Sequence, residues 1–228
     1  MPLTPLQRRV VEVVSSTPGS GDFVLAGGAA LAVLGIGDRT TKDLDWFAQQ
    51  PQTVDHFAPT LLRACTQAGL RVQRLRAEPG FHRFQISDAQ DTTIVDLAWD
   101  ARLRPPSPSV CGPVLHRDEL AADKMLALFG RAAPRDFVDV YRLRAFYSRD
   151  QLCALAAEKD HGFNGPIFGQ MLGKLHSYER IEFPLDDAAF TDMREGFEGW
   201  QQELALETPR ASLQRDPPSL DPPELELD

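Results

Sequence analysis

The segment Leu25-Ala-Gly-Gly-Ala-Ala-Leu31, followed by Arg39-Thr-Thr-Lys-Asp-Leu-Asp-Trp-Phe47, gives the clearest indication of how this chain folds. It predicts a short strand that ends in a Gly-Gly turn, then a short helix, then a second strand opened by Asp43 and Asp45. Glycine lets the backbone N–H groups at a helix start approach a phosphate closely. Side chains two residues apart on a strand project to the same face. Two carboxylates facing a phosphate-binding turn are typical of a site for a hard divalent cation such as Mg²⁺.

The composition is that of an ordinary globular protein. The chain has 228 residues, of which 43% are hydrophobic and 25% charged, which is enough for one domain or two small ones. No apolar run reaches the roughly 20 residues needed to cross a bilayer, and no signal-peptide core follows the N-terminus. We therefore expect a cytoplasmic protein with no membrane association. The cysteines Cys65, Cys111 and Cys153 are far apart, which favours neither a disulfide framework nor a zinc site.

The charge balance points in two directions. The net charge of −9 argues against a generic nucleic-acid binder, although part of it lies in the acidic tail from Glu207 onward. Arginine, the better bidentate phosphate ligand, is concentrated between residues 63 and 104. A local basic face and a set of solvated strand edges are both compatible with this segment. Its arginines are Arg63, Arg71, Arg74, Arg76, Arg83, Arg102 and Arg104.

Hydrophobic periodicity predicts how the first half is organised. Apolar residues at helical spacing indicate an opening helix, and Gly69 ends a later one. From residue 70 the period changes to two, with turn residues between the segments, which predicts an antiparallel meander that extends the sheet. In that meander Leu75 is expected to point inward, although less clearly than Leu70 and Val72. We expect helices at residues 5–16, 28–34 and 54–68, and strands at 22–26, 44–48, 70–76, 81–86 and 92–99.

A proline-rich connector at residues 104–109 separates this half from a helical half. We expect helices at 117–129 and 134–146, one capped by Ser148, and two more near 163–176 and 187–206. The expected fold class is α/β (α+β), with a mixed or antiparallel sheet, flanking helices and a helical C-terminal half. The expected domains are an α/β core at residues 1–104, a helical domain at 105–207 that completes the active-site cleft, and a disordered, acidic, proline-rich tail at 208–228.

Asp96 is a third candidate carboxylate. It interrupts an apolar strand, Thr93-Ile-Val-Asp-Leu-Ala-Trp99, that is expected to be buried. A buried carboxylate needs a partner, a metal ion or a raised pKa. We favour a role in the metal site, and the alternative is a structural hydrogen bond to a neighbouring arginine. Asp100, at the end of the same strand, is interpreted as a turn residue.

Charged residues of the helical half are further candidates for the site. Lys124 lies among apolar residues, and Arg131 follows two turns later on the same face. Asp136 and Asp139 fall in the expected first turn of the helix that Pro134 begins, where acids are favoured by the helix dipole. Spacing alone leaves open whether these acids cap the helix or serve a site. It also leaves open whether Lys124 extends to solvent.

Three motifs in order carry a family resemblance. They are Phe23-Val-Leu-Ala-Gly-Gly-Ala-Ala-Leu31, then Arg39-x-Thr41-x-Asp43-Leu-Asp45-x-Phe47, then Ala122-Asp-Lys124 with Arg131-x-x-Pro-Arg-Asp136-x-x-Asp139-x-Tyr-x-Leu143. Over roughly residues 20–145 the chain resembles the AbiEii/AbiGii-type toxin nucleotidyltransferases. The resemblance implies a nucleotidyltransferase fold like that of DNA polymerase β. It also implies a neighbouring antitoxin, and some relatives add nucleotides to the acceptor end of tRNA.

The resemblance also implies roles for single residues. Asp43 and Asp45 match the family's metal-binding carboxylates, Lys124 its phosphate-contacting lysine, and Asp136 and Asp139 the acids of its fourth motif. Where many relatives carry a hydroxyl after the glycines, this chain has Ala29. Asp96 is added to these residues from the strand order alone. The expected catalytic residues are then Asp43, Asp45, Asp96, Lys124 and Asp139, of which Asp43, Asp45 and Asp96 are the expected metal ligands. The expected nucleotide-binding residues are Gly27, Gly28, Arg39, Thr41, Lys124, Arg131, Arg135 and Asp136.

The expected activity is transfer of a nucleoside monophosphate from an NTP to an acceptor hydroxyl, with Mg²⁺ or Mn²⁺ as cofactor. The expected setting is a toxin of a toxin–antitoxin pair that acts on the tRNA acceptor end. One alternative is nucleotidylation of a protein or a small molecule such as an antibiotic, which fits the acidic net charge better than RNA does. Another is a binding module that has lost catalysis, which Ala29 would allow and the retained Asp43, Asp45 and Lys124 argue against.

Overall fold

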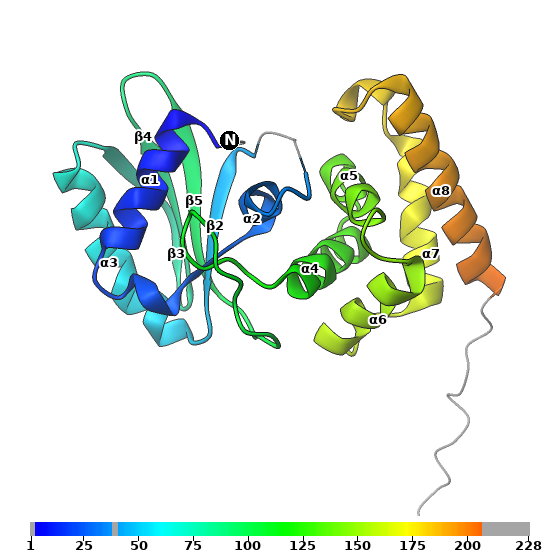
Figure 1. The fold of residues 1–228 in the computed structure, drawn as a ribbon, viewed down its shortest axis with the longest axis horizontal. Coiled ribbons are helices and arrows are strands. Elements are labelled where there is room, and N and C mark those ends of the chain that lie inside the picture. The colour runs from blue at the N-terminus through cyan, green and yellow to red at the C-terminus, as the bar shows by residue number, and fades with distance from the viewer. Residues whose placement is uncertain (1–2, 38–40, 207–228) are drawn as a thin grey trace, which may run out of the picture.

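A computed structural model describes residues 3–37 and 41–206 of the chain as two lobes, one built on a sheet and one purely helical (Figure 1). The sheet has the order β1-β2-β5-β4-β3. The β2 and β5 strands run parallel and the other neighbours antiparallel, so the sheet is mixed, as expected. The strands are β1 (Val24–Ala26), β2 (Asp43–Ala48), β3 (Arg71–Glu78), β4 (Phe81–Ser87) and β5 (Thr92–Trp99).

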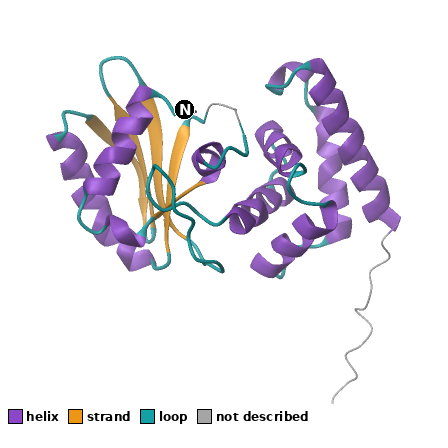
Figure 2. Ribbon diagram, viewed as in Figure 1, coloured by secondary structure: helices purple, strands orange, loops and turns teal. Residues whose placement is uncertain are grey.

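Two amphipathic helices cover one face of this sheet (Figure 2). The α1 helix (Pro5–Ser16) has the bounds that the sequence predicts, because Thr4 and Gln7 form a capping box before its apolar stripe. The α3 helix (Pro51–Gln67) buries Phe57 against Phe23, with ring centroids 4.5 Å apart. Because these two apolar stripes are buried on one face of the sheet, the other face is free of them and can carry polar strand residues.

The α2 helix (Gly27–Val33) lies on that opposite face, against β1 and β2. It begins one residue earlier than predicted. The expected strand at 22–26 is shorter than predicted, since Ser20–Asp22 form a 3₁₀ turn before β1. These small shifts leave the predicted order of strand, Gly-Gly turn, helix and strand unchanged.

The predicted antiparallel meander of β3, β4 and β5 is confirmed. The prediction for Leu75 was wrong, since its side chain is 45% exposed. A bulge between Arg74 and Arg76 adds a residue to β3, which breaks the alternation of inward and outward side chains.

The helical lobe follows the connector, and aromatic rings such as Phe137 and Phe197, 5.4 Å apart, pack its centre. The α5 helix ends three residues earlier than expected, because the N–H groups of residues 144–146 bond carbonyls three residues back and tighten the last turn. Ser148 caps the next helix, as predicted. The helices are α4 (Arg117–Gly130), α5 (Pro134–Leu143), α6 (Arg149–Lys159), α7 (Gly165–Leu172) and α8 (Asp187–Leu206), with 3₁₀ turns at Gly173–Ser177 and Arg180–Glu182.

An ion-pair cluster joins the two lobes. The buried Lys159 Nζ lies 2.6 Å from Asp100 Oδ2 at the end of β5 and 2.5 Å from Asp123 Oδ1 on α4. Asp100 is therefore an ion-pair partner as well as the residue that follows the strand. The Glu119 carboxylate accepts hydrogen bonds from the backbone N–H groups of Leu103 and Arg104, which fixes the start of the connector. These bonds hold the helical lobe in place against the sheet.

The described helices include none with the length and apolar composition that crossing a bilayer needs. The predicted disordered tail at residues 208–228 lies outside the described part of the chain. The predicted domain boundary near residue 104 falls between the last described strand, which ends at Trp99, and the α4 helix, which begins at Arg117. The division into two domains stays a prediction.

Candidate active site

Asp43 and Asp45 lie on the face of β2 that α1 and α3 leave open. Their strand alternates in burial, with Leu44 and Trp46 in the core and the two carboxylates on the other side. The expectation that both carboxylates share one face is therefore confirmed.

The Gly-Gly turn lies directly against the second carboxylate. Gly27 has φ +63°, and a Cβ there would overlap Asp45 Oδ2 and lie 2.8 Å from Asp45 Cγ. Only glycine accommodates both this backbone conformation and this contact. The turn and the carboxylate are consequently one unit, and Gly28 lines the cavity beside them.

Asp96 is the direct neighbour of Asp45 on the adjacent strand β5. It is 7% exposed, and its two oxygens accept hydrogen bonds from Arg83 Nε and Nη2 at 2.8 and 2.7 Å. The alternative interpretation, a bond to a neighbouring arginine, is thus what the structure contains. Asp96 nonetheless lines the same cavity as Asp43 and Asp45, so a role as metal ligand stays a prediction.

The site gives Asp45 an unusual ionisation. Burial raises the pKa of Asp45 to about 6, and the nearby Asp96 and Asp43 carboxylates act in the same direction. Lys124 and Arg135 oppose this rise without cancelling it. Desolvated, mutually repelling carboxylates are stabilised by a cation, which is the environment expected at a metal site.

Lys124 reaches the site from α4. Its Nζ lies 2.9 Å from Asp139 Oδ2, and the two side chains are only 10% and 3% exposed. The alternative in which Lys124 extends to solvent was therefore wrong. The expectation that Asp139 lies in the first turn of α5 was also wrong, because that turn contains only Asp136. Asp139 instead orients Lys124, and it is not among the described residues that line the cavity.

Asp136 has the capping role that its position predicts. It accepts a hydrogen bond from the Ala133 N–H and two from Arg131, at 2.8 and 2.7 Å. Asp136 is 0% exposed and holds Arg131 in place, and its expected contact with a nucleotide stays a prediction. The exposed Arg135 approaches Asp43 Oδ2 to 3.8 Å.

Thr41 lines the cavity, but its hydroxyl donates to the backbone carbonyl of Asp43 at 2.9 Å. Its expected contact with a nucleotide stays a prediction, and in the structure it shapes the start of β2. Arg39, another expected nucleotide-binding residue, lies outside the described residues.

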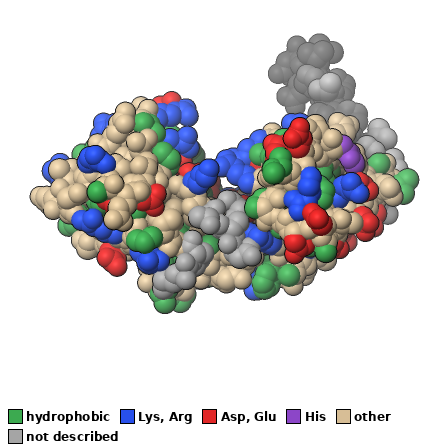
Figure 3. Space-filling view, turned by 90° about the horizontal axis from the view of Figure 1, so that it is seen from above, with side chains coloured by type: hydrophobic (Ala, Val, Ile, Leu, Met, Phe, Trp, Pro, Cys, Tyr) green, Lys and Arg blue, Asp and Glu red, His purple; other side chains and the backbone are tan. Residues whose placement is uncertain are grey.

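One cavity of about 1000 Å³ joins these groups across the two lobes. Figure 3 shows the molecule hollowed between the lobes, with Lys and Arg side chains on both sides. The sequence analysis had placed Arg83 in an arginine-rich segment. It did not predict that any residue after Tyr141 would line the cavity. The described lining is Gly28, Thr41, Lys42, Asp43, Asp45, Arg83, Asp96, Lys124, Arg131, Arg135, Arg142, Ile181, Glu182 and Pro184.

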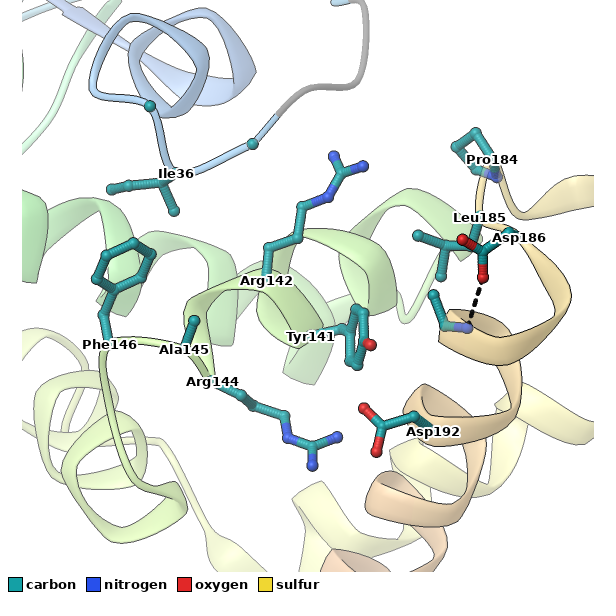
Figure 4. Close-up of a pocket in the computed structure, with 13 residues that line it drawn as sticks. Ile36, Tyr141, Arg142, Arg144, Ala145, Phe146, Pro184, Leu185, Asp186 and Asp192 are labelled. Atoms are coloured by element: carbon teal, nitrogen blue, oxygen red, sulfur yellow. Dashed lines mark hydrogen bonds between the residues drawn. The ribbon is translucent and has the colours of Figure 1, made fainter.

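A second cavity, of about 820 Å³, adjoins the first and shares Arg142 and Pro184 with it. Arg142 extends from α5 between the loop of Ile36 and Pro184 (Figure 4). Burial and a hydrogen bond to Asp192 raise the pKa of Tyr141 on the floor of this cavity. The second cavity thus widens the cleft on the side of the helical lobe.

The residues present fit a magnesium-type ion that is completed by its substrate. No group of three His, Cys, Asp or Glu residues in the described ranges forms a ready-made metal cage. Mg²⁺ is usually bound through one or two carboxylates plus substrate phosphates and water, not by an all-protein cage. The pair Asp43 and Asp45, with the raised pKa of Asp45, meets that requirement.

A mixed sheet that presents two carboxylates beside a Gly-Gly turn, opposite the cations of a helical lobe, is the arrangement expected of an enzyme that transfers a phosphate-containing group. The model of the family described as "Nucleotidyl transferase AbiEii toxin, Type IV TA system" matches residues 10–221. The chain belongs to this family. The match extends well beyond the segment on which the sequence resemblance rested and includes the helical lobe. Membership makes the chain a toxin-family nucleotidyltransferase, with an NTP as substrate and an antitoxin as the implied partner.

Solved structures of low sequence identity share the fold. JHP933 from Helicobacter pylori is 18% identical, with a TM-score of 0.57, over 88% of this chain and 89% of its own. A putative nucleotidyltransferase from H. pylori has the same identity and score, over 88% and 92%. MenT4, a nucleotidyltransferase toxin from Mycobacterium tuberculosis, is 16% identical, with a TM-score of 0.52, over 88% and 85%. No curated protein matches the sequence.

Proposed function

We propose that this enzyme transfers a nucleoside monophosphate from an NTP to an acceptor hydroxyl, with Mg²⁺ or Mn²⁺ as cofactor, and that the acceptor is the 3′ end of tRNA. The supporting observation is a single cavity. It is lined by Asp43 and Asp45 on the sheet, and by Lys124, Arg131 and Arg135 from the helical lobe. Carboxylates for a metal and cations for a polyphosphate therefore face each other across one space.

The triphosphate would lie between the Gly-Gly turn and the helical lobe. Backbone N–H groups at residues 27 and 28 would contact its oxygens, since Ala29 is fully buried and supplies no hydroxyl. Lys124, held by Asp139, and Arg131, held by Asp136, would balance the charge of the departing pyrophosphate. Because both cations are fixed by buried carboxylates, little reorganisation is needed when that charge develops.

Asp43 and Asp45 would hold the metal ion, which would supply charge to polarise the α-phosphate and to lower the pKa of the attacking hydroxyl. In the reaction the acceptor hydroxyl gives its proton to a carboxylate or to solvent and its oxygen bonds to the α-phosphorus, while the bond to the bridging oxygen breaks and pyrophosphate leaves with the electron pair. Asp96 would complete the metal site or take the hydroxyl proton. To do either, it would exchange part of its pairing with Arg83 for the metal or the proton.

Substitution of Asp45 tests this assignment. We expect Asp45→Asn to abolish incorporation of labelled nucleotide while the protein stays folded, because an amide is a poor ligand for Mg²⁺. The matched control is Asp150→Asn, which changes an exposed acid on α6 in the same way and should keep full activity. Full activity of Asp45→Asn would refute the proposal.

The acceptor has a second candidate. The net charge of −9 favours a protein or small hydroxylated molecule, such as an antibiotic, over a polyanion. Incubation with each labelled NTP and a crude tRNA fraction distinguishes the two, because only the tRNA proposal expects label in RNA. Calorimetry with Mg²⁺ and NTPs addresses the third possibility, a binding module without catalysis, since a relic that binds neither gives no heat.

A further inference from the structure

A row of charged side chains crosses the open face of the sheet and continues past the carboxylates. Asp45 pairs in register with Asp96, Asp96 with Arg83 on β4, and Arg83 with Arg76 on the edge strand β3. Residues directly opposite one another on neighbouring strands share a face. With strands about 4.8 Å apart, Arg76 lies three strands and about 14 Å from Asp45.

Arg76, Phe81 and Arg83, here named the arginine face, lie in cation–π contact with one another around the Phe81 ring. The Arg76 and Arg83 guanidinium carbons lie over the Phe81 ring, 5.2 and 5.7 Å from its centroid. Each guanidinium uses Nε and Nη2 to bind a carboxylate, Glu78 for Arg76 and Asp96 for Arg83. These bonds fix the orientation of both planes and leave the Nη1 groups outside either pair.

The arginine face is open to solvent. The Arg76 and Arg83 side chains are 56% and 44% exposed, and α3 packs on the other side of these strands. The edge strand β3 is unsuited to pairing with a peptide strand, because it is rich in charged side chains and interrupted by a bulge. The guanidinium groups and the aromatic ring of the arginine face offer a different mode of binding.

The geometry of phosphoryl transfer indicates that the acceptor approaches the site over the arginine face. In phosphoryl transfer the nucleophile and the leaving group lie roughly in line on opposite sides of the phosphorus. The turn that would hold the triphosphate follows β1, on one side of β2, and Asp96 lies on β5, on the other side. The attacking hydroxyl therefore arrives from the side of Asp96, and whatever carries it extends over β4 and β3.

We propose that the arginine face binds the single-stranded 3′ end of a nucleic-acid acceptor; the proposal rests on the function proposed above and identifies where the acceptor lies. Nucleobases stack on aromatic rings and guanidinium planes, and the Nη1 groups can donate to phosphates or base edges. Because Glu78 and Asp96 already balance both arginines, stacking supplies most of the affinity, which fits an acidic protein that binds RNA locally.

The test is binding of a fluorescent single-stranded oligoribonucleotide that ends in CCA, measured by anisotropy with the full chain. We expect Arg76→Ala and Phe81→Ala each to weaken binding about fivefold or more. The matched control is Arg74→Ala, which removes the same charge from the same strand. Arg74 pairs with the buried Phe84 on the opposite face and should leave affinity unchanged within about twofold. Binding of a fluorescent NTP with Mn²⁺ reports that each variant is folded.

Equal affinities for all three variants and the unchanged protein would overturn the proposal, and so would an equal loss in all three. The proposal would also be overturned if Arg76→Ala bound RNA as tightly as the unchanged protein but no longer transferred labelled nucleotide to a protein acceptor. The test needs no catalysis. RNA affinity that depends on the arginine face therefore supports this inference even if Asp45→Asn stays active and the proposed reaction fails.

Discussion

At the scale of single residues, the site depends on one glycine and one carboxylate that lie in contact. Gly27 combines φ +63° with a position where a Cβ would overlap Asp45 Oδ2. Gly35 has a similar φ of +71°, but no atom lies within 4 Å of its Cβ position. Substituting these two glycines therefore distinguishes the free-energy cost of a left-handed backbone from the cost of displacing Asp45.

We expect Gly27→Ala and Gly35→Ala each to lose about 1–2 kcal/mol of unfolding free energy from backbone strain. Gly27→Ala should lose more and also reduce nucleotide incorporation about a hundredfold, because Asp45 must move by about an ångström. Gly35→Ala should keep its activity within about twofold. Urea denaturation and labelled-NTP incorporation measure the two effects. Equal activities in the two variants would show that the contact with Asp45 does not matter.

The raised pKa of Asp45 predicts a pH dependence of stability in metal-free protein. A carboxyl whose folded-state pKa is about 6, against 3.8 unfolded, favours the folded state below pH 3.8, and this contribution is lost as the pH rises through 6. Asp45→Asn removes the ionisation, so it should be more stable than the unchanged protein at pH 8, by at most about 3 kcal/mol. The difference should shrink toward pH 4. Urea midpoints in EDTA across this range check it, and equal stabilities at pH 8 would contradict it.

At the scale of helices and strands, the sequence predicts what is locally encoded. The bounds of α1 follow from its capping box and apolar stripe, those of α8 follow from its apolar residues, and the cap role of Asp136 follows from its place after Pro134. The outward turn of Leu75 depends on a bulge in strand pairing, which no local pattern signals. The pairing of Lys124 with Asp139 depends on how α4 and α5 cross, so spacing alone left its partner open.

That pair ties two helices together and positions a cation, and substitution can separate the two roles. Lys124→Met leaves a carboxylate that is 3% exposed without its lysine, so we expect a loss of about 3–5 kcal/mol of stability. The double variant Lys124→Met, Asp139→Leu should regain most of this stability, because it removes both charges. Neither variant should incorporate nucleotide. Denaturation and incorporation assays test both statements, and activity in the double variant would remove Lys124 from the mechanism.

At the scale of the whole molecule, the site arises from long-range pairing. Asp45 and Asp96 are 51 positions apart and meet only because β2 and β5 run parallel in register. The sequence allowed both carboxylates to be predicted, and offered a bond from Asp96 to an arginine, but it did not identify that arginine as Arg83. Arg142 and Ile181, from distant parts of the helical lobe, were missed because Arg142 occupies an unspecified position of the third motif and Ile181 lies outside every motif. The net charge of −9 likewise conceals the cations that converge on one cavity.

Because the cavity is lined by both lobes, a bound NTP should stabilise the protein as a whole. A ligand that binds only the folded state at about 100 times its Kd adds about 2.7 kcal/mol to the unfolding free energy. For a chain of this size that corresponds to a rise in Tm of about 5–10 °C. We expect this rise with Mg²⁺ and the preferred NTP, a smaller one with the other NTPs, and none in Asp45→Asn. Thermal scans with ATP, CTP, GTP and UTP in turn identify the preferred nucleotide. An equal rise in Asp45→Asn would mean that the NTP binds away from the carboxylates, and the site described above would then be the wrong one.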